Sequence, residues 1–221
     1  MEKATQVMEM KYSVLMSVYA KDSPEYLQIS IDSMLNQTVK PDQVVLVIDG
    51  PIPVEIENVI NQYSENKDLF TLVRLEKNEG LGHALNIGLQ YCRNELVARM
   101  DADDISLPER CEKELICFQK DEKLDVCGCN LDEFLGNPDN ILTSRIVPSD
   151  YDHIKRFMRR RQAFNHATVI YRKSTVIAAG GYQTLKRKED FDLFSRMLSA
   201  GAFAKNLEES LYLCRVGQDN Y

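Results

Sequence analysis

The sequence predicts an α/β fold in which a mainly parallel central sheet is flanked by helices. Short apolar runs alternate with segments in which apolar residues recur every three or four positions, the pattern of strands alternating with helices. The run 44–48 (VVLVI) is continuously apolar, as expected for a strand covered by helices on both faces. Strands and helices that alternate in this way favour a parallel sheet that binds ligands at the carboxyl ends of its strands.

The first half of the chain accounts for most of this prediction. The expected strands are Tyr12–Val18, 44–48, 70–75 and Leu96–Met100. A helix should follow the N-cap residue Ser23, because Pro24 suits a first helical turn. Further helices are expected over 52–63 and 81–89. Ser106 and Glu109 have the spacing of a capping box, which predicts a helix from there to Phe118.

The second half is less regular. Strands are expected at 125–134, 142–147, 168–171 and 211–215, and helices at 151–159 and 189–198. A chain of 221 residues with 44% hydrophobic content suits one domain with a substantial core. We therefore expect a single domain over 1–221. Because the chain ends just after an expected strand, we also expect a C-terminal extension beyond Tyr221.

Charge and cysteine content limit the partners and the compartment. The net charge of −7 argues against a nucleic-acid partner, which usually meets a basic face. The N-terminal segment lacks the apolar run of a signal peptide or a membrane span, so we expect a cytoplasmic location. The six cysteines lack the spacing of a zinc site. They are expected to be free thiols in a reducing compartment, most of them in the core.

The strongest chemical signal is the acidic segment that directly follows the strand Leu96–Met100. Asp101, Asp103 and Asp104 place three carboxylates within four residues, and their mutual repulsion calls for a neutralising group. A hard divalent cation such as Mn²⁺ or Mg²⁺ prefers oxygen ligands of this kind. The alternative is an acidic loop that caps the next helix.

Other polar residues are weak signals taken singly. Asp49 follows the strand 44–48 and could bind a base or a ribose, or it could be a turn residue. Asn78 and Gly80 lie between a strand and a helix, where backbone can approach an anion. Asp190, next to Glu189 at a helix start, could be a general base or could complement the helix dipole.

Two further signals are basic. His166 could contact a phosphate, although a single histidine is more often structural. The only dense basic run comprises Arg156, Arg159, Arg160 and Arg161. Such a run is usually a solvated face, but in an acidic protein it could meet a phosphate-bearing acceptor or a membrane surface.

Taken in order, these segments strongly resemble glycosyltransferase family 2. The matching segments are 12–19 (YSVLMSVY), 35–38 (LNQT), 47–50 (VIDG), Asn78-x-Gly80, 101–104 (DADD) and Glu189-Asp190. The Asp-x-Asp element alone is unspecific, whereas the ordered set is specific and covers nearly the whole chain. The sequence is similar to bacterial polysaccharide-assembly enzymes of the amylovoran-biosynthesis type.

The resemblance implies a glycosyltransferase-A fold, with a Rossmann-like sheet, and an inverting, metal-dependent glycosyl transfer from a nucleoside-diphosphate sugar, UDP-sugars being favoured. It implies that residues 10–105 bind the nucleotide sugar and residues 106–221 bind a saccharide acceptor, lipid-linked acceptors included. The roles it implies for single residues are donor binding by Ser17, Tyr19, Asp49, Asn78, Gly80, Asp101 and His166, metal binding by Asp103 and Asp101, acceptor binding by Glu189 and base catalysis by Asp190.

The sequence leaves three other functional hypotheses open. A nucleotidyltransferase would share the sheet and the metal, but no glycine-rich loop follows the first strand. A haloacid-dehalogenase-type hydrolase would carry its Asp-x-Asp after the first strand rather than the fourth. A non-catalytic module that binds nucleotide sugars is the rival from a different class. The sugar, the linkage and the oligomeric state are not predicted.

Overall fold

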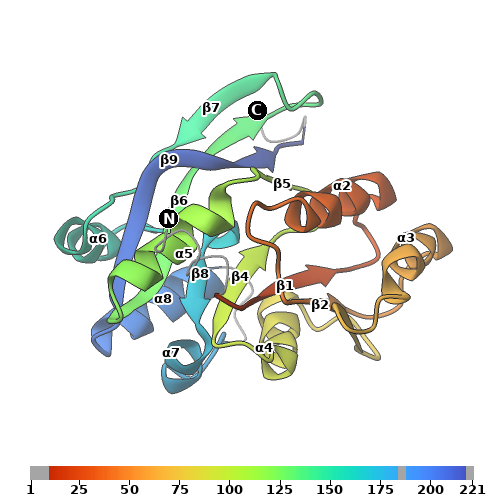
Figure 1. The fold of residues 1–221 in the computed structure, drawn as a ribbon, viewed down its shortest axis with the longest axis horizontal. Coiled ribbons are helices and arrows are strands. Elements are labelled where there is room, and N and C mark those ends of the chain that lie inside the picture. Colours follow the sequence, from red (N-terminus) through yellow and green to blue (C-terminus); the bar gives the residue numbers. More distant parts are fainter. Residues whose placement is uncertain (1–9, 184–187, 218–221) are drawn as a thin grey trace.

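The parallel half of the predicted sheet is present with nearly the expected bounds. The computed structural model describes residues 10–183 and 188–217, and within them nine strands form one sheet (Figure 1). The polar segment 1–9 and the end of the chain at Tyr221 lie outside the described residues. Four parallel strands occupy one side of the sheet in the order β3-β2-β1-β4: β1 (Tyr12–Val18), β2 (Gln43–Ile48), β3 (Phe70–Arg74) and β4 (Leu96–Met100).

The second half of the chain extends the same sheet with mixed pairing. Its strands are β5 (Ile105–Ser106), β6 (Leu124–Phe134), β7 (Ile141–Arg145), β8 (Ile170–Arg172) and β9 (Phe203–Arg215). Strand β8 joins β4 and β6 in antiparallel pairs, whereas β6 and β9 are parallel. Strand β7 pairs only with β6 in the described residues. The donor and acceptor halves expected from the sequence thus share one sheet.

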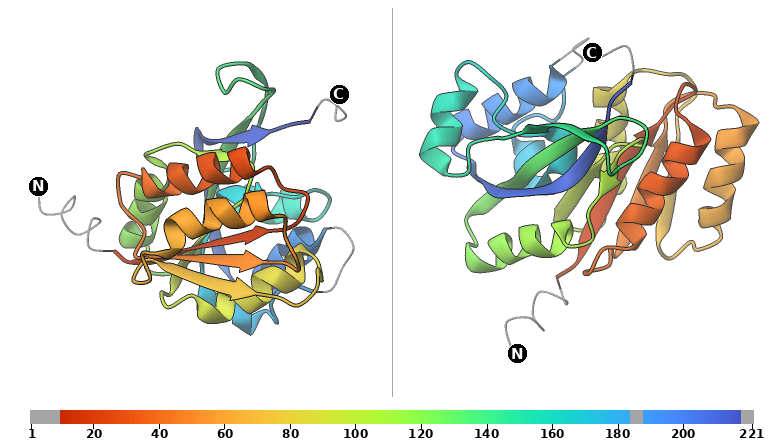
Figure 2. Two further views of the ribbon diagram at one scale, coloured as in Figure 1. Left: turned by 90° about the vertical axis from the view of Figure 1, so that its right-hand side faces the viewer. Right: turned by 90° about the horizontal axis from the view of Figure 1, so that it is seen from above.

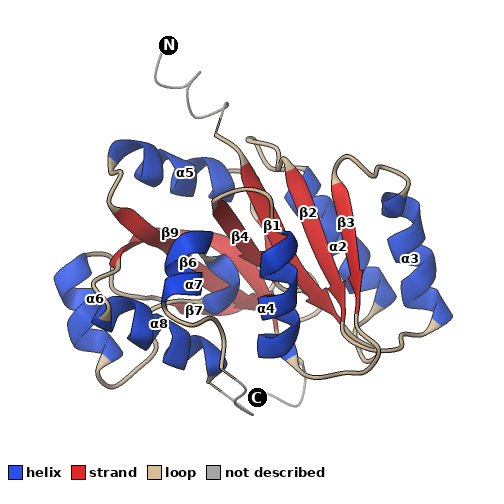
Figure 3. Cartoon of the chain, turned by 90° about the horizontal axis from the view of Figure 1, so that it is seen from below, coloured by secondary structure: helices blue, strands red, loops and turns tan. Residues whose placement is uncertain are grey.

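Helices cover both faces of this sheet, as the sequence predicts. One face carries α2 (Pro24–Leu35), α3 (Val54–Ser64) and α5 (Arg110–Lys120), and the other carries α4 (Leu81–Tyr91), α6 (Tyr151–Met158), α7 (Lys173–Ala178) and α8 (Glu189–Ser199) (Figures 2 and 3). Two hydrophobic clusters fill the two layers between helices and sheet. Leu27 and Ile60 belong to the first, and Leu85 and Phe194 to the second.

The predicted capping box at Ser106 is wrong. Ser106 lies in strand β5, and its hydroxyl accepts a hydrogen bond from Gln37 Nε2 at 3.0 Å. Helix α5 begins only at Arg110, with Glu109 as its N-cap and no side-chain cap. The spacing of serine and glutamate was present, but Gln37 engages the serine hydroxyl that a capping box needs.

Several other elements differ from expectation. Strand β5 and the 3₁₀ turn His166–Thr168 were not predicted, β7 ends at Arg145 rather than at 147, and β8 begins at Ile170 rather than at 168. Helix α3 begins at Val54, directly after Pro53, rather than at residue 52. The short helix α7 was not predicted. Strand β9 begins at Phe203, eight residues before the predicted start at 211. The first part of β9 alternates buried and exposed residues and carries Lys205, so its apolar content is too low to stand out from the sequence.

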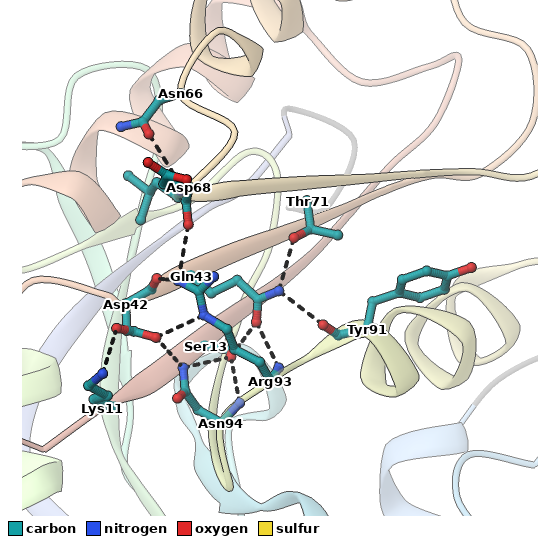
Figure 4. Close-up of polar contacts among 11 residues, drawn as sticks. Lys11, Ser13, Asp42, Gln43, Asn66, Asp68, Thr71, Tyr91, Arg93 and Asn94 are labelled. Atoms are coloured by element: carbon teal, nitrogen blue, oxygen red, sulfur yellow. Dashed lines mark hydrogen bonds and ion pairs between the residues drawn. The ribbon is translucent and has the colours of Figure 1, made fainter.

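A polar network closes the amino-terminal edge of the parallel strands (Figure 4). Ser13 at the start of β1 donates to Gln43 Oε1 at 2.7 Å, and the same oxygen accepts from the backbone of Arg93 at 2.8 Å. Asn94 donates to both Ser13 and Asp42, each at 3.1 Å. The hydrogen bond from Asn94, together with the side chain of Arg93, lowers the pKa of the Asp42 carboxyl. This edge is held by side chains that bind one another.

Two expectations drawn from composition can also be compared with the structure. All six cysteines are free, and Cys92, Cys111, Cys127 and Cys129 are buried, which confirms the prediction of free thiols located mostly in the core. Within residues 10–183 and 188–217, the helices are all too short or too polar to span a bilayer.

Candidate active site

The register of the parallel strands brings the predicted donor-binding residues together. Met16 of β1 pairs with Met100 of β4, which places Asp101 level with Ser17. Val18 pairs with Ile48 of β2, so Asp49 follows at the same edge. Because all three strands run in the same direction, their carboxyl ends meet at one side of the sheet.

A cavity of about 390 Å³ opens at this edge, and nearly all of the donor set lines it. The predicted residues in its wall are Ser17, Tyr19, Asp49, Asn78, Gly80, Asp101 and Asp103. They come from four different segments of the chain, which only the fold places side by side. His166 is the one member of the predicted donor set that does not line this cavity. Asp22, which was not predicted, does.

Asp49 organises the loop between β3 and α4. Its two carboxylate oxygens accept hydrogen bonds from the backbone amides of Glu79 at 2.9 Å and Gly80 at 3.0 Å, and its carbonyl accepts one from Asn78. Gly80 has a φ of +93°, which favours glycine. At Gly50, φ is +88° and an added Cβ would lie 2.5 Å from the backbone nitrogen of Asn78. The loop can therefore approach Asp49 closely only because Gly50 lacks a side chain.

A buried arginine binds Asp101 from the sheet side. Arg99 is fully buried in β4, and its guanidinium donates to the Asp101 carboxylate and to the Met100 carbonyl. The Asp101 backbone is also held, since Ser30 Oγ donates to its carbonyl at 2.6 Å and its amide donates to Tyr212 Oη at 3.3 Å. Asp101 is thus fixed in position before any ligand binds.

Asp22 and Asp103 in the wall of this cavity, and Asp104 beside it in the wall of a neighbouring space, lie close enough to Asp101 for their charges to repel. Burial first, and then the charges of Asp103 and Asp101, raise the pKa of Asp22 to about 6. Burial and the same two neighbours raise the pKa of Asp104 to about 8. The pKa of Asp103 is raised by desolvation and by Asp101. An acidic group of this kind suits a divalent cation, which would relieve the repulsion.

The protein offers such a cation only part of a coordination shell. In the described part of the chain, no group of three or more His, Cys, Asp or Glu side chains is arranged to hold a metal ion. Asp101 and Asp103 could supply one or two oxygen ligands. Mg²⁺ and related ions commonly bind through one or two carboxylates together with substrate phosphates. The residues present therefore fit a cation that arrives with, or is completed by, a phosphate-bearing ligand.

A second cavity, of about 500 Å³, lies on the other side of Asp101. Asp190 and His166 line it, together with Asp104 and the partly apolar wall formed by Phe164 and Phe191. Of the residues that the structure describes, Asp101 alone lines both cavities. The two spaces are therefore adjacent, with a carboxylate at their common boundary.

Asp190 lies in the first turn of α8 with its carboxylate turned into the second cavity. Gln162 Nε2 donates to Asp190 Oδ2 at 2.8 Å, and the Phe191 amide donates to Oδ1 at 2.7 Å. The helix is anchored by Leu193 and Phe194, which are both fully buried. Phe191, the next residue, is only partly buried and lines the cavity.

Neither Glu189 nor His166 lines the first cavity. Glu189 lines neither of the two cavities and faces helix α4, where a Cβ added at Gly82 would lie 3.6 Å from the Glu189 Cβ. His166 Nε2 lies 2.9 Å from Tyr182 Oη. Burial, reinforced by the positive charge of Arg99, lowers the pKa of His166 to about 4. His166 is therefore neutral at pH 7 and can act as a hydrogen-bond partner rather than a cation.

Sequence reasoning missed Asp22, Arg99 and Gln162. The signal for Arg99 was present, because a single arginine in an otherwise apolar strand must find a partner when it is buried. Asp22 comes three residues after Tyr19 and accepts a hydrogen bond from its backbone amide at 2.9 Å, which is a recognisable turn pattern. Gln162 carried no signal, since only the packing of α6 against α8 brings it to Asp190.

The family follows from comparison with known sequences. The sequence profile described as Glycosyl transferase family 2 matches residues 13–185. This span begins in β1 and includes all described residues that line the first cavity, whereas Lys188, Asp190, Phe191 and Cys214 of the second cavity lie beyond it. The chain belongs to glycosyltransferase family 2. The nucleotidyltransferase and hydrolase readings are thereby excluded.

Relatives from bacteria cover nearly the whole of this glycosyltransferase chain. It is 39% identical over 208 residues to the amylovoran biosynthesis glycosyltransferase AmsE of Erwinia amylovora, a match that spans 94% of this chain and 77% of AmsE. It is 36% identical over 212 residues to the Escherichia coli UDP-Gal:alpha-D-GlcNAc-diphosphoundecaprenol beta-1,3-galactosyltransferase, spanning 95% of this chain and 75% of that enzyme.

Solved structures show the fold. The S. aureus TarS structure 1–349 in complex with UDP has a TM-score of 0.74 at 22% identity, covering 96% of this chain and 62% of that one. The mannosyltransferase PcManGT from Pyrobaculum calidifontis, in complex with GDP-Man and Mn²⁺, has a TM-score of 0.71 at 16% identity, covering 100% of this chain and 64% of that one. The fold of this glycosyltransferase is the glycosyltransferase-A fold that the resemblance implied.

Proposed function

We propose that this chain transfers a sugar from a nucleoside-diphosphate donor in the first cavity to an acceptor hydroxyl in the second. The observation that carries the proposal is the position of Asp101, the residue that lines both cavities. A donor whose diphosphate lies near Asp101 and Asp103 would present its sugar to the second cavity. There Asp190 can meet an incoming hydroxyl.

The chain's own residues divide the work of binding. Asp49 and the loop held by it would contact the base or ribose, while Asn78 and Gly80 offer backbone and amide groups to the donor. Asp101 and Asp103 would hold a divalent cation, Mn²⁺ or Mg²⁺, together with the donor diphosphate. Such a cation, when bound, neutralises the charge that develops on the diphosphate leaving group. Arg99 keeps Asp101 oriented toward that position.

Asp190 is the group suited to take the proton of the acceptor hydroxyl. A carboxylate held at a cavity wall by Gln162 has a defined direction and remains accessible to a substrate. One base and one displacement suffice, so the anomeric configuration should invert and no covalent intermediate is required. Glu189, one residue earlier, would help to hold the acceptor, and His166 would contact the donor from the acceptor side.

The proposal extends to substrates and setting. Residues 10–105 would form the donor half and 106–221 the acceptor half of one domain. We favour a UDP-sugar as the donor and a lipid-linked saccharide as the acceptor, because the name of the similar Escherichia coli enzyme contains a donor and an acceptor of these kinds. Polysaccharide assembly is the process for which AmsE is named. Free thiols suit a cytoplasmic setting, with a peripheral contact to the inner face of a membrane.

The experiment that tests this assignment measures the melting temperature with UDP and Mn²⁺. A ligand that binds only the folded state should raise it by about 5–10 °C at a hundredfold excess over the dissociation constant. Asp103→Ala should lose the Mn²⁺-dependent part of this rise and keep the parental melting temperature without ligand. Asp139→Ala, which removes an exposed aspartate of the β6–β7 turn, is the matched control and should behave as the parent.

Two results would count against the proposal. If Asp103→Ala kept the full Mn²⁺-dependent rise in melting temperature, Asp103 would not be a ligand of the metal. Donor binding without release of UDP, for every acceptor supplied, would favour the non-catalytic binding module over the transferase.

A further inference from the structure

Basic side chains line the second cavity of a chain whose net charge is −7. They are Arg145, Arg160, Arg161 and Lys188. Among the residues that the structure describes, the wall of the first cavity contains no basic side chain. The two binding spaces of this protein therefore differ in charge, one acidic and one with a cationic rim.

Three of these four cations have no partner within residues 10–183 and 188–217. Arg145 Nε forms an ion pair with Glu133 at 2.6 Å. The side chains of Arg160, Arg161 and Lys188 make no ion pair or hydrogen bond with any residue that the structure describes. By comparison, Arg196 is fully engaged by Asp192 and two backbone carbonyls. The charge of the cavity rim is available to a ligand.

The chain holds both arginines next to the proposed base. The backbone amides of Arg160 and Arg161 both donate to the Phe157 carbonyl at 3.0 Å, in a tight turn after α6. The next residue is Gln162, whose side chain binds Asp190. Arg160, Arg161 and Asp190 therefore line the same cavity, and the residue that follows Arg161 in the chain binds the base.

Complementation of the helix dipole is the simpler explanation of basic residues near a helix end. Lys155 and Arg156 in the last turn of α6 already fulfil that role, and Arg156 Nε donates to the Asp152 carbonyl within the helix. Arg160 and Arg161 lie beyond the end of α6 and line the cavity. Dipole complementation does not explain that placement.

We infer that Arg160, Arg161 and Lys188 form a subsite for a diphosphate ester carried by the acceptor. Guanidinium groups bind phosphate oxygens in a bidentate manner, and lysine adds a point charge. The acceptor sugar would then lie between this subsite and Asp190, against the apolar surfaces of Phe164 and Phe191. The inference rests on the proposed function, since it assigns the second cavity to the acceptor, and it adds the chemical class that this acceptor belongs to.

The experiment titrates hexyl diphosphate into the protein by calorimetry, with EDTA present so that no metal can hold the probe in the first cavity. Arg160→Gln/Arg161→Gln should weaken binding about tenfold or more, because charge-assisted hydrogen bonds to phosphate are among the stronger polar contacts. Arg156→Gln/Arg159→Gln is the matched control: it removes the same charge from the same basic run outside the cavity, and its affinity should stay within about twofold of the parent. Inorganic pyrophosphate serves as the second probe.

The two probes and a competition separate the outcomes. If hexyl diphosphate binds more tightly than inorganic pyrophosphate, the subsite recognises an esterified diphosphate. If the two affinities are equal, the subsite recognises the diphosphate anion alone. Both results support a diphosphate subsite. Equal losses in the two double variants, displacement of the probe by UDP once Mn²⁺ has been added in excess of the EDTA, or no binding to the parent would overturn it. Binding of UDP with Mn²⁺ is measured separately, so failure of the donor site is distinguishable from failure of this subsite.

Discussion

Asp190 is held by two hydrogen bonds and still faces an open space, a combination that suits a residue needed only when the proton moves. Asp190→Asn should preserve the shape of the side chain and the contact with Gln162 while removing the basic group. Turnover should fall about a hundredfold or more, the usual scale for the loss of a general base, whereas affinity for UDP with Mn²⁺ should stay at the parental value. Release of UDP in steady-state kinetics, together with a UDP titration, measures both quantities.

The matched control for that variant is Glu189→Gln, one residue earlier on the same helix. Glu189 is proposed to help hold the acceptor and not to take its proton, so its loss should raise the acceptor KM more than it lowers kcat. Near-parental turnover of Asp190→Asn would show that another group takes the proton of the acceptor hydroxyl.

Asp49 combines a loop-organising role with its predicted contact to the nucleoside. Asp49→Ala would leave the Glu79 and Gly80 amides without their acceptor, so we expect a loss of stability of about 1–3 kcal/mol. Affinity for UDP should fall about tenfold or more, because a charge-assisted hydrogen bond is lost and the loop is released. Urea unfolding and calorimetry measure the two effects. Parental affinity in a variant that still folds would reduce Asp49 to a turn residue.

At the scale of elements, the amino-terminal edge depends on one glutamine. Gln43 is almost fully buried, and its amide joins Ser13, the Arg93 backbone, Thr71 and the Tyr91 carbonyl. Gln43→Leu would remove all of these contacts and leave buried polar groups unpaired. We expect the free energy of unfolding to fall by about 2–3 kcal/mol, measured by urea denaturation.

An exposed member of the same network provides the comparison. Lys11 forms an ion pair with Asp42 at 3.7 Å, and its side chain is 73% exposed. Lys11→Gln should change the free energy of unfolding by less than about 0.5 kcal/mol, since exposed pairs contribute little. Equal effects of the two substitutions would show that burial does not control this edge.

The elements that sequence could predict are those whose signal is local. Strands β1 to β4 are short apolar runs, and α2 has an N-cap serine followed by proline, so their bounds were nearly correct. Strand β9 is long because it pairs with β6 through its first half, and that pairing is a property of the fold rather than of its mixed composition. The capping-box spacing at Ser106 was misleading because Gln37, distant in sequence, binds the hydroxyl.

The same distinction applies to the site. Ser17, Asp49 and Asp101 follow predicted parallel strands, so their meeting could be expected from topology. The position of His166 could not, because it depends on β8 pairing antiparallel to β4, which no local pattern specifies. Gln162 and the cationic rim depend on α6 packing against α8, a contact between segments with no shared sequence signal.

At the scale of the whole molecule, two adjacent cavities separated by Asp101 make a stereochemical prediction. An acceptor hydroxyl that enters from the second cavity would attack the donor sugar on the face opposite the leaving diphosphate. The product should therefore have the anomeric configuration opposite to that of the donor, as determined from the NMR coupling constants of the new glycosidic linkage. A retained configuration would require a covalent or front-face mechanism and would contradict the single displacement.

The strands β1 and β2 carry stabilising polar contacts at one end and cavity-lining residues at the other. Ser13 and Gln43 hold the first end, while Ser17 and Asp49 stand at the second. Changes in the loops after these strands are therefore free to alter the shape of the cavities at little expense to the contacts that close the opposite edge. This separation along the strand axis is a structural basis for evolvability, because new donor and acceptor preferences can arise by loop variation on a scaffold that remains folded.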